Sequence, residues 1–125
     1  MPALASHQAK AEHNLAFAGS IDVLTPYRDW IVTALFYSAL HFASALLHKL
    51  NYSDAWHDDH GKMLKLFAIA APLRHETQLR DDYKQLRDDR WEAQYNMREF
   101  TRDEVETLRS EVLPRLRQRV AELMQ

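Results

Sequence analysis

An apolar segment in the first half of the chain constrains the fold more than any other feature. Residues 30–47 carry no formal charge, yet they include Tyr37, His41 and Ser44, and His48 follows directly. At about 100° per residue on a helix, these four polar side chains fall within about 60° of one another, along one narrow line. The segment therefore predicts a helix that is apolar on most sides and lies at the centre of the protein, covered by other helices or by a second subunit.

The same segment is close to the minimum length of a membrane-spanning helix, which is about 17 apolar residues. Polar side chains interrupt it, however, and the rest of the chain is strongly polar with no second candidate span. The first residues, MPALASH, also lack the basic segment and apolar run of a secretory signal. We therefore expect a buried helix and no association with a membrane.

Composition favours one compact all-α domain over residues 1–125. The chain has only two glycines and four prolines, which favours helices joined by short loops over strands joined by tight turns. The absence of cysteine excludes disulfides and a cysteine nucleophile and fits a reducing compartment, so we expect a cytoplasmic protein. A formal net charge of −2 argues against a broad basic surface for duplex nucleic acid but does not exclude a local basic pocket.

Five helical stretches follow from the spacing of apolar residues and from capping signals. Thr25 and Pro26 are typical of a helix start, and Pro72 separates the third stretch from the fourth. Thr101 and Glu104 form a capping-box pattern that opens the fifth stretch, in which Pro114 predicts a kink or an interruption. The expected ranges are 5–24, 26–50, 57–71, 78–97 and 102 onward.

The fourth stretch contains a charged residue where its period predicts core. The inward stripe, at alternating spacings of four and three, consists of Leu79, Tyr83, Leu86, Arg90, Ala93 and Met97. A buried guanidinium without a partner is unfavourable. Arg90 therefore either extends along the apolar surface and pairs with Asp or Glu, which is the commoner outcome, or points into a polar cavity that accepts an anion.

Three motifs together resemble those of the HEPN superfamily. The segment FYSALH is similar to an FYxALH-type second helix, a histidine follows the next turn, and a later helix has a tyrosine–leucine–arginine pattern that ends in Ala-x-Tyr. The match spans roughly residues 11–97. The matching positions are Phe36, Tyr37, Ala39, Leu40, His41, His60, Tyr83, Leu86, Arg90, Ala93 and Tyr95. The resemblance implies an up-and-down bundle of four or five helices, frequently a homodimer, with a link to RNA or nucleotides.

The chain departs from this family at the catalytic motif. Active HEPN ribonucleases carry an arginine followed, after four to six residues, by a histidine. The last histidine here is His75, neither Arg28 nor Arg74 precedes it at that spacing, and Tyr95 stands where a histidine would follow Arg90. Tyrosine, with a pKa of about 10, is a poor base near neutral pH. Arg90 and Tyr95 also lie about 140° apart on an ideal helix, so they are expected to share a site only if the helix ends between them or a second subunit completes it.

No metal or cofactor is expected. His57 and His60 lie one helical turn apart in HDDH, but no second ligand pair accompanies them, and exposed polar residues at a helix start are ordinary. His41 and His48 are about two turns apart, too far to bind one ion together. Two glycines are also too few for a phosphate-binding glycine-rich loop.

The sequence leaves two candidate functions of different classes, and a third that ranks below them. The first is a non-catalytic or weakly catalytic HEPN-like module that binds RNA or a nucleotide, because the histidine of the family's catalytic motif is missing. The second is a dimeric protein-interaction module that docks a partner such as a nucleotidyltransferase-like antitoxin; the third is a ribonuclease with a relocated site. The candidate ligand-binding residues are Tyr37, His41, Ser44, His60, Arg90 and Tyr95. A homodimer is expected because the apolar second helix would otherwise leave a face exposed.

Overall fold

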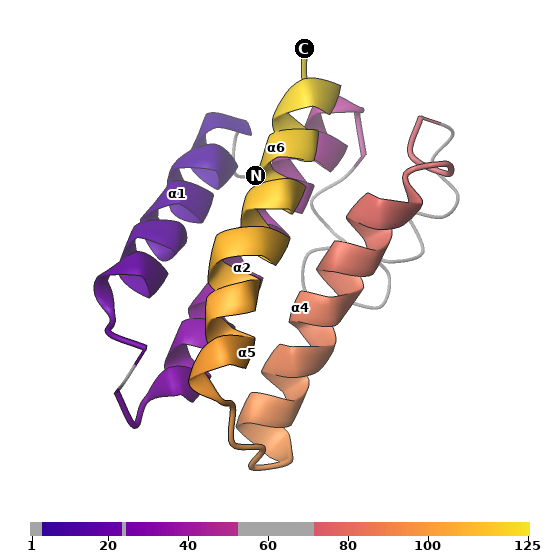
Figure 1. Cartoon of the computed structure of the whole chain (residues 1–125). Helices are drawn as coiled ribbons and strands as arrows, with labels where there is room; N and C mark the ends of the chain where they lie inside the picture. The colour runs from indigo at the N-terminus through magenta and orange to yellow at the C-terminus, as the bar shows by residue number, and fades with distance from the viewer. Residues whose placement is uncertain (1–3, 24, 53–71) are drawn as a thin grey trace.

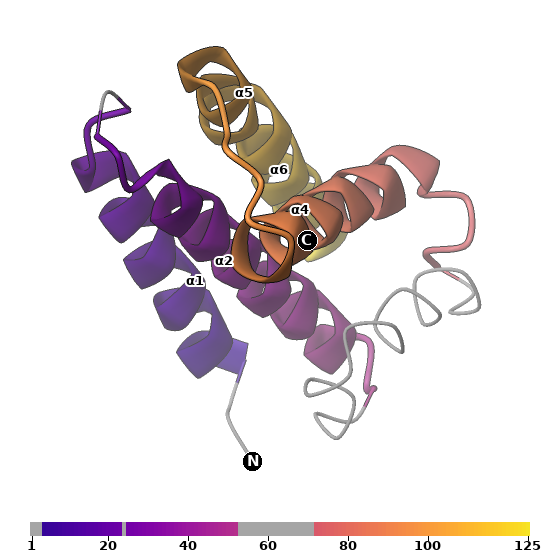
Figure 2. The same ribbon diagram turned by 90° about the horizontal axis from the view of Figure 1, so that it is seen from below.

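The computed structural model describes residues 4–23, 25–52 and 72–125, in which four longer helices pack as a bundle (Figure 1). The elements are α1 (Leu4–Ser20), α2 (Arg28–Lys49), α4 (Thr77–Tyr95), α5 (Arg102–Thr107), the π-helical η2 (Leu108–Val112) and α6 (Leu113–Leu123). Figure 2 shows α1 and α4 on either side of α2, and α6 contacts both α2 and α4. No strand occurs in these ranges, and the all-α prediction is confirmed. The expected third helix, 57–71, lies outside the described residues.

The apolar segment forms the core helix, as its sequence predicts. Fifteen of the 22 residues of α2 are buried, and the helix contacts α1, α4 and the arm made by α5, η2 and α6. By length and composition α2 could cross a membrane, but 83% of its apolar window is buried inside the protein. The helix ends where Asn51 adopts a φ of 69° and the Tyr52 N–H donates to the Leu47 carbonyl at 2.9 Å, the hydrogen bond of a Schellman turn.

The first helix, α1, ends at Ser20, four residues before the predicted end. The Ser20 hydroxyl donates to the Phe17 carbonyl at 2.7 Å. Arg109 Nη1 donates to the carbonyls of Ala18 and Ile21 at 3.2 and 2.8 Å. These side chains give hydrogen bonds to carbonyls that would accept from backbone N–H groups if the helix continued. Arg109 also joins the end of α1 to η2.

The core helix begins at Arg28, two residues later than predicted. Thr25 does not cap the helix itself, because its hydroxyl accepts a hydrogen bond from the Tyr27 N–H at 3.3 Å in the preceding turn. The Arg28 side chain donates to the carbonyls of Val23 at 3.0 Å and Phe100 at 2.7 Å. Arg28 therefore holds the start of α2 against the segment that follows α4.

The predicted inward stripe of α4 is confirmed except at its last position. Leu79, Tyr83, Leu86 and Ala93 are buried. Met97 is 88% exposed, because α4 ends at Tyr95 and the chain turns at Met97 with a φ of 54°. The predicted stripe was therefore longer than the helix, and its last position falls beyond the end of α4.

The C-terminal arm contains both predicted features. Thr101 and Glu104 form the capping box, each side chain accepting a hydrogen bond from the other residue's N–H. The π-helical η2 ends two residues before Pro114. Proline lacks an N–H and its ring clashes with the carbonyl four residues earlier, and the wider π turn accommodates this interruption. The buried side of the arm consists of Val105, Leu108, Val112, Leu113, Leu116 and Val120.

Candidate functional site

Arg90 on α4 faces aromatic rings instead of a carboxylate. Its Nη2 donates to the Tyr37 hydroxyl at 2.9 Å, and its Cζ lies 5.4 Å from the centroid of that ring. The Phe36 ring lies at 5.8 Å and the Tyr95 ring at 5.7 Å from the same atom. Within the described ranges no Asp or Glu pairs with Arg90, and its buried Nε has no hydrogen-bond partner. Pairing with Asp or Glu, the commoner of the two expected arrangements, is therefore not found among the described residues.

Arg90 and Tyr95 share this site although α4 is continuous between them. The expectation that this requires a helix end or a second subunit was wrong, because it considered only the directions in which the two side chains leave the helix. An arginine side chain is long enough to bring its guanidinium to a ring that leaves about 140° away. At 5.7 Å from the ring centroid, the contact is within the range of a cation–π interaction.

His41 contacts His7 on α1. Its Nδ1 lies 3.1 Å from Nδ1 of His7, and the two ring centroids are 5.4 Å apart. His7 is buried, with 3% of its surface exposed. The predicted polar line is therefore divided: Tyr37 contacts α4, whereas the hydrogen bond to His7 draws His41 toward the opposite neighbour of α2. The sequence period places both residues on one face but does not specify which neighbour each will contact.

The two remaining predicted residues are not joined to Arg90 by any described contact. Ser44 is 1% exposed, and its hydroxyl has no hydrogen-bond partner. It lies about 10 Å beyond Tyr37 along α2. His60, like the HDDH segment that contains it, lies outside the described residues. Of the six predicted residues, the described contacts bring together Tyr37, Arg90 and Tyr95.

A groove adjoins Tyr95 between the start of α2 and the end of α4. It has a volume of about 330 Å³ and is lined by Asp29, Trp30, Thr33, Ala93, Gln94 and Tyr95. Gln94 Nε2 donates to Thr33 Oγ1 at 3.4 Å, and Thr33 Oγ1 donates to the Asp29 carbonyl at 2.9 Å. The sequence did not predict this groove, because Asp29, Trp30, Thr33 and Gln94 belong to no motif. One feature of the sequence could have indicated it: Trp30 and Thr33 precede Tyr37 at spacings of three and four residues, which places them on the same face of the helix as Tyr37.

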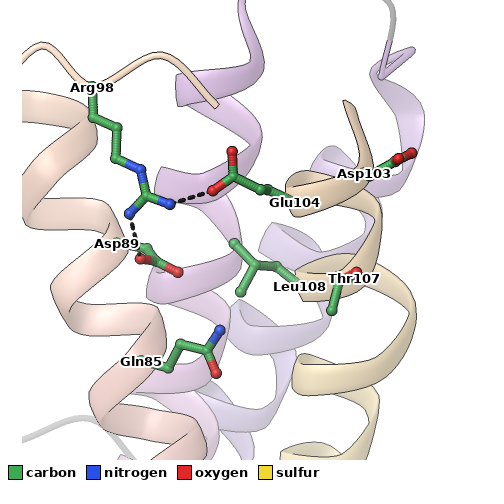
Figure 3. A pocket seen from close by; sticks show the side chains of 7 residues that line it. All are labelled: Gln85, Asp89, Arg98, Asp103, Glu104, Thr107 and Leu108. Atoms are coloured by element: carbon green, nitrogen blue, oxygen red, sulfur yellow. Dashed lines mark hydrogen bonds and ion pairs between the residues drawn. The ribbon is translucent and has the colours of Figure 1, made fainter. Parts of the chain in front are cut away.

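A second cavity, of about 360 Å³, lies between α4 and α5 (Figure 3). Arg98 donates to Asp89 at 3.1 Å, to Glu92 at 2.6 Å and to Glu104. The hydrogen bond that Arg98 donates to Glu92 is the main cause of the raised pKa of Arg98, while burial raises the pKa of the Asp89 carboxyl. Because three carboxylates already hold its guanidinium, Arg98 fastens the end of α4 to the start of α5 and is not free to bind an anion.

No group of three or more His, Cys, Asp or Glu that could hold a metal ion occurs in the part of the chain that the structure describes. The site around Arg90 therefore offers a cation, phenol hydroxyls and aromatic faces. These groups bind anions and flat rings.

Comparison with known proteins places the chain in a family. No curated protein and no solved structure matches it. The family model described as HEPN domain matches residues 8–113. This range includes all of α2 and α4, and hence Tyr37, Arg90 and Tyr95. The chain belongs to the HEPN domain family.

Proposed function

We propose that this protein binds RNA or a free nucleotide through Arg90, and that it lacks the ribonuclease chemistry of catalytic HEPN proteins. The observation that carries the proposal is the Arg90 guanidinium, which lies within about 6 Å of the ring centroids of both Tyr37 and Tyr95 and has no carboxylate partner among the described residues. The planar fork of a guanidinium matches phosphate oxygens. Exposed aromatic rings stack on bases.

The electrostatic surroundings of the other arginines support this assignment. Carboxylates lie within ion-pair distance of most of them, namely Arg87, Arg98, Arg102, Arg109, Arg115, Arg117 and Arg119. Arg28 donates to backbone carbonyls instead. No ion pair of Arg74 or Arg80 occurs among the described residues, but neither of them contacts the aromatic site around Arg90. In a chain with a net charge of −2, an anion is attracted to a local uncompensated cation and not to the surface as a whole.

The absence of cleavage is proposed from the groups that surround Arg90. Its described polar neighbour is the Tyr37 hydroxyl, and Tyr95 supplies the nearby second phenol. A phenol is a poor proton acceptor near neutral pH. Histidine side chains exchange protons near neutral pH, but the described hydrogen-bond partner of His41 is His7 on α1.

The purified protein is therefore expected to bind a fluorescent single-stranded RNA without shortening it. Because the proposed contact is with phosphate, affinity measured by anisotropy should fall as salt rises, with a logarithmic slope of about −0.7 for each phosphate contacted. Gel analysis of the same RNA in the presence of a chelator tests for cleavage. Robust metal-independent cleavage, or binding that is insensitive to salt, would contradict the proposal.

A protein-interaction module is the second candidate, favoured by exposed aromatic side chains near the same site. Trp30, Trp91 and Tyr95 are each more than half exposed, and the rings of Trp91 and Tyr95 lie 4.5 Å apart. Clustered exposed apolar side chains are typical of contact surfaces. The proposed partners are a second copy of this chain and a nucleotidyltransferase-like protein.

Sedimentation equilibrium tests the first of these partners. We expect a homodimer, and we expect Trp91→Ser to raise its dissociation constant at least about tenfold, as truncation of an interface aromatic commonly does. Phe17→Ser, which alters an aromatic residue on α1 that is 50% exposed, is the matched control. A clean monomer at high micromolar concentration would exclude the dimer.

A further inference from the structure

We infer that the groove beside Arg90 selects a guanine base, so that the ligand of this protein is a guanine nucleotide, either free or within single-stranded RNA. The inference rests on the proposed function, because it assumes that Arg90 binds the phosphate. It concerns a different set of side chains, those of Asp29, Trp30, Thr33 and Gln94, which line the groove with Tyr95.

Tyr95 connects the groove to the phosphate site. Its ring lines the groove, and the centroid of the same ring lies 5.7 Å from Arg90 Cζ. The groove and Arg90 also lie on the same two helices, since Gln94 bonds to Thr33 one turn from where Arg90 bonds to Tyr37. A nucleotide whose phosphate contacts Arg90 therefore has its base within reach of the groove.

The groove provides aromatic surfaces for a flat ring from both helices. Trp30 on α2 is 54% exposed and Tyr95 on α4 is 58% exposed. A volume of about 330 Å³ is at the small end of the range for ligand pockets, which suits one base. Stacking on aromatic rings contributes affinity for every base and therefore does not distinguish among them.

Selectivity comes from the polar side chains of the groove, and Asp29 is the most discriminating of them. Among the described residues, Asp29 makes no ion pair, and its carbonyl, not its carboxylate, accepts the Thr33 hydroxyl. An ionised carboxylate only accepts hydrogen bonds. Guanine presents two adjacent donors, the N1 imino and N2 amino groups, on one edge. Adenine and cytosine present one amino donor beside an acceptor, and uracil presents one imino donor between two acceptors.

Gln94 complements this pattern. One N–H of its amide donates to Thr33 at the long distance of 3.4 Å, which leaves the second N–H for an acceptor such as guanine O6. Together, an acceptor carboxylate and a donor amide match the donor, donor and acceptor order of the guanine edge. The other three bases place at least one acceptor opposite the carboxylate, a ring nitrogen in adenine and cytosine and a carbonyl oxygen in uracil, and this acceptor repels it.

The test compares the binding of GMP, AMP, CMP and UMP to the full chain by titration calorimetry. The wild type is expected to bind GMP at least about tenfold more tightly than AMP, the discrimination typical of a paired hydrogen-bond contact. Asp29→Asn should remove most of this preference while weaker binding of all four nucleotides persists. Asp103→Asn, which changes a 94% exposed carboxylate in the other cavity, is the matched control and should keep the preference.

Asp29 lies in the first turn of α2, where a carboxylate also stabilises the helix, so circular dichroism must confirm that Asp29→Asn is folded. Gln94→Leu, at an exposed position of α4, is a second variant that should lose the preference without this helix effect. Equal affinity of the wild type for all four nucleotides, or an undiminished preference in both variants, would overturn the inference.

The outcomes separate this inference from the proposed function. If the four nucleotides bind equally and Arg90→Gln abolishes their binding, the phosphate site stands and the guanine assignment fails. If neither nucleotides nor RNA bind, the proposed function itself fails. A parallel titration with an oligouridylate that contains one guanosine, compared with the uniform oligouridylate, distinguishes guanine within RNA from the free nucleotide.

Discussion

Arg90→Gln is expected to weaken the binding of a nucleotide 5′-monophosphate or a single-stranded RNA at least about tenfold. A hydrogen bond between a charged donor and an anion contributes about 1.5–3 kcal/mol, and a tenfold change corresponds to about 1.4 kcal/mol. Glutamine keeps a polar side chain but removes the charge and the fork. The fold should persist, because among the described residues this side chain makes one hydrogen bond, to Tyr37. Titration calorimetry measures the loss.

Two variants control for this substitution. Arg87→Gln removes an arginine from the same helix that is paired with Asp88 at 2.9 Å, and it should leave the affinity unchanged. Arg90→Lys keeps the charge but lacks the planar fork, so its affinity should lie between those of the wild type and Arg90→Gln. Wild-type affinity in Arg90→Gln would show that the ligand binds elsewhere.

Arg115→Ala is expected to lower the free energy of unfolding by about 2–3 kcal/mol. Arg115 Nε and Nη2 donate to the two carboxylate oxygens of Asp82 at 2.9 and 2.7 Å, and so join α6 to α4. The Asp82 side chain is only 2% exposed, and without Arg115 its described partner is the Gln78 amide at 2.9 Å. A carboxylate buried without its counter-charge is strongly destabilising. The 49% exposure of the Arg115 side chain keeps the loss below that of a fully buried pair.

Arg117→Ala provides the matched control on the same helix. Arg117 pairs with Glu12 at 2.8 Å, but both side chains are about half exposed, at 51% and 47%. An exposed pair contributes less than about 1 kcal/mol. Urea denaturation followed by circular dichroism should therefore separate the two variants. Equal losses would mean that the burial of Asp82 does not determine the strength of its contact.

The sequence predicts the parts of this fold that depend on local pattern. The uncharged run predicts α2 as core, the Thr101 and Glu104 spacing predicts the start of α5, and Pro114 predicts an interruption near η2. The same reasoning identifies Arg90, because a charge on an apolar stripe persists in a fold only where the surroundings accommodate it. Each of these inferences needs only the residues within one helix.

Features that depend on packing between helices were not predictable in this way. The contact of His41 with His7 depends on how α1 lies against α2, and no local period specifies that. The approach of Arg90 to Tyr95 depends on the reach of a flexible side chain. The groove requires the end of α4 to lie beside the start of α2, which brings Asp29 near Gln94 across more than 60 residues of sequence.

The most direct test of the central claim, that Arg90 binds the phosphate of the ligand, is the nuclear magnetic resonance signal of its own Nε–H group. This buried donor has no acceptor among the described residues. On addition of a nucleotide 5′-monophosphate, the Arg90 signal should shift, whereas the signals of Arg28 and Arg115, whose Nε–H groups already have acceptors, should stay in place. The corresponding nucleoside, which lacks the phosphate, should leave all three unchanged. A nucleotide that binds without moving the Arg90 signal would contradict the account.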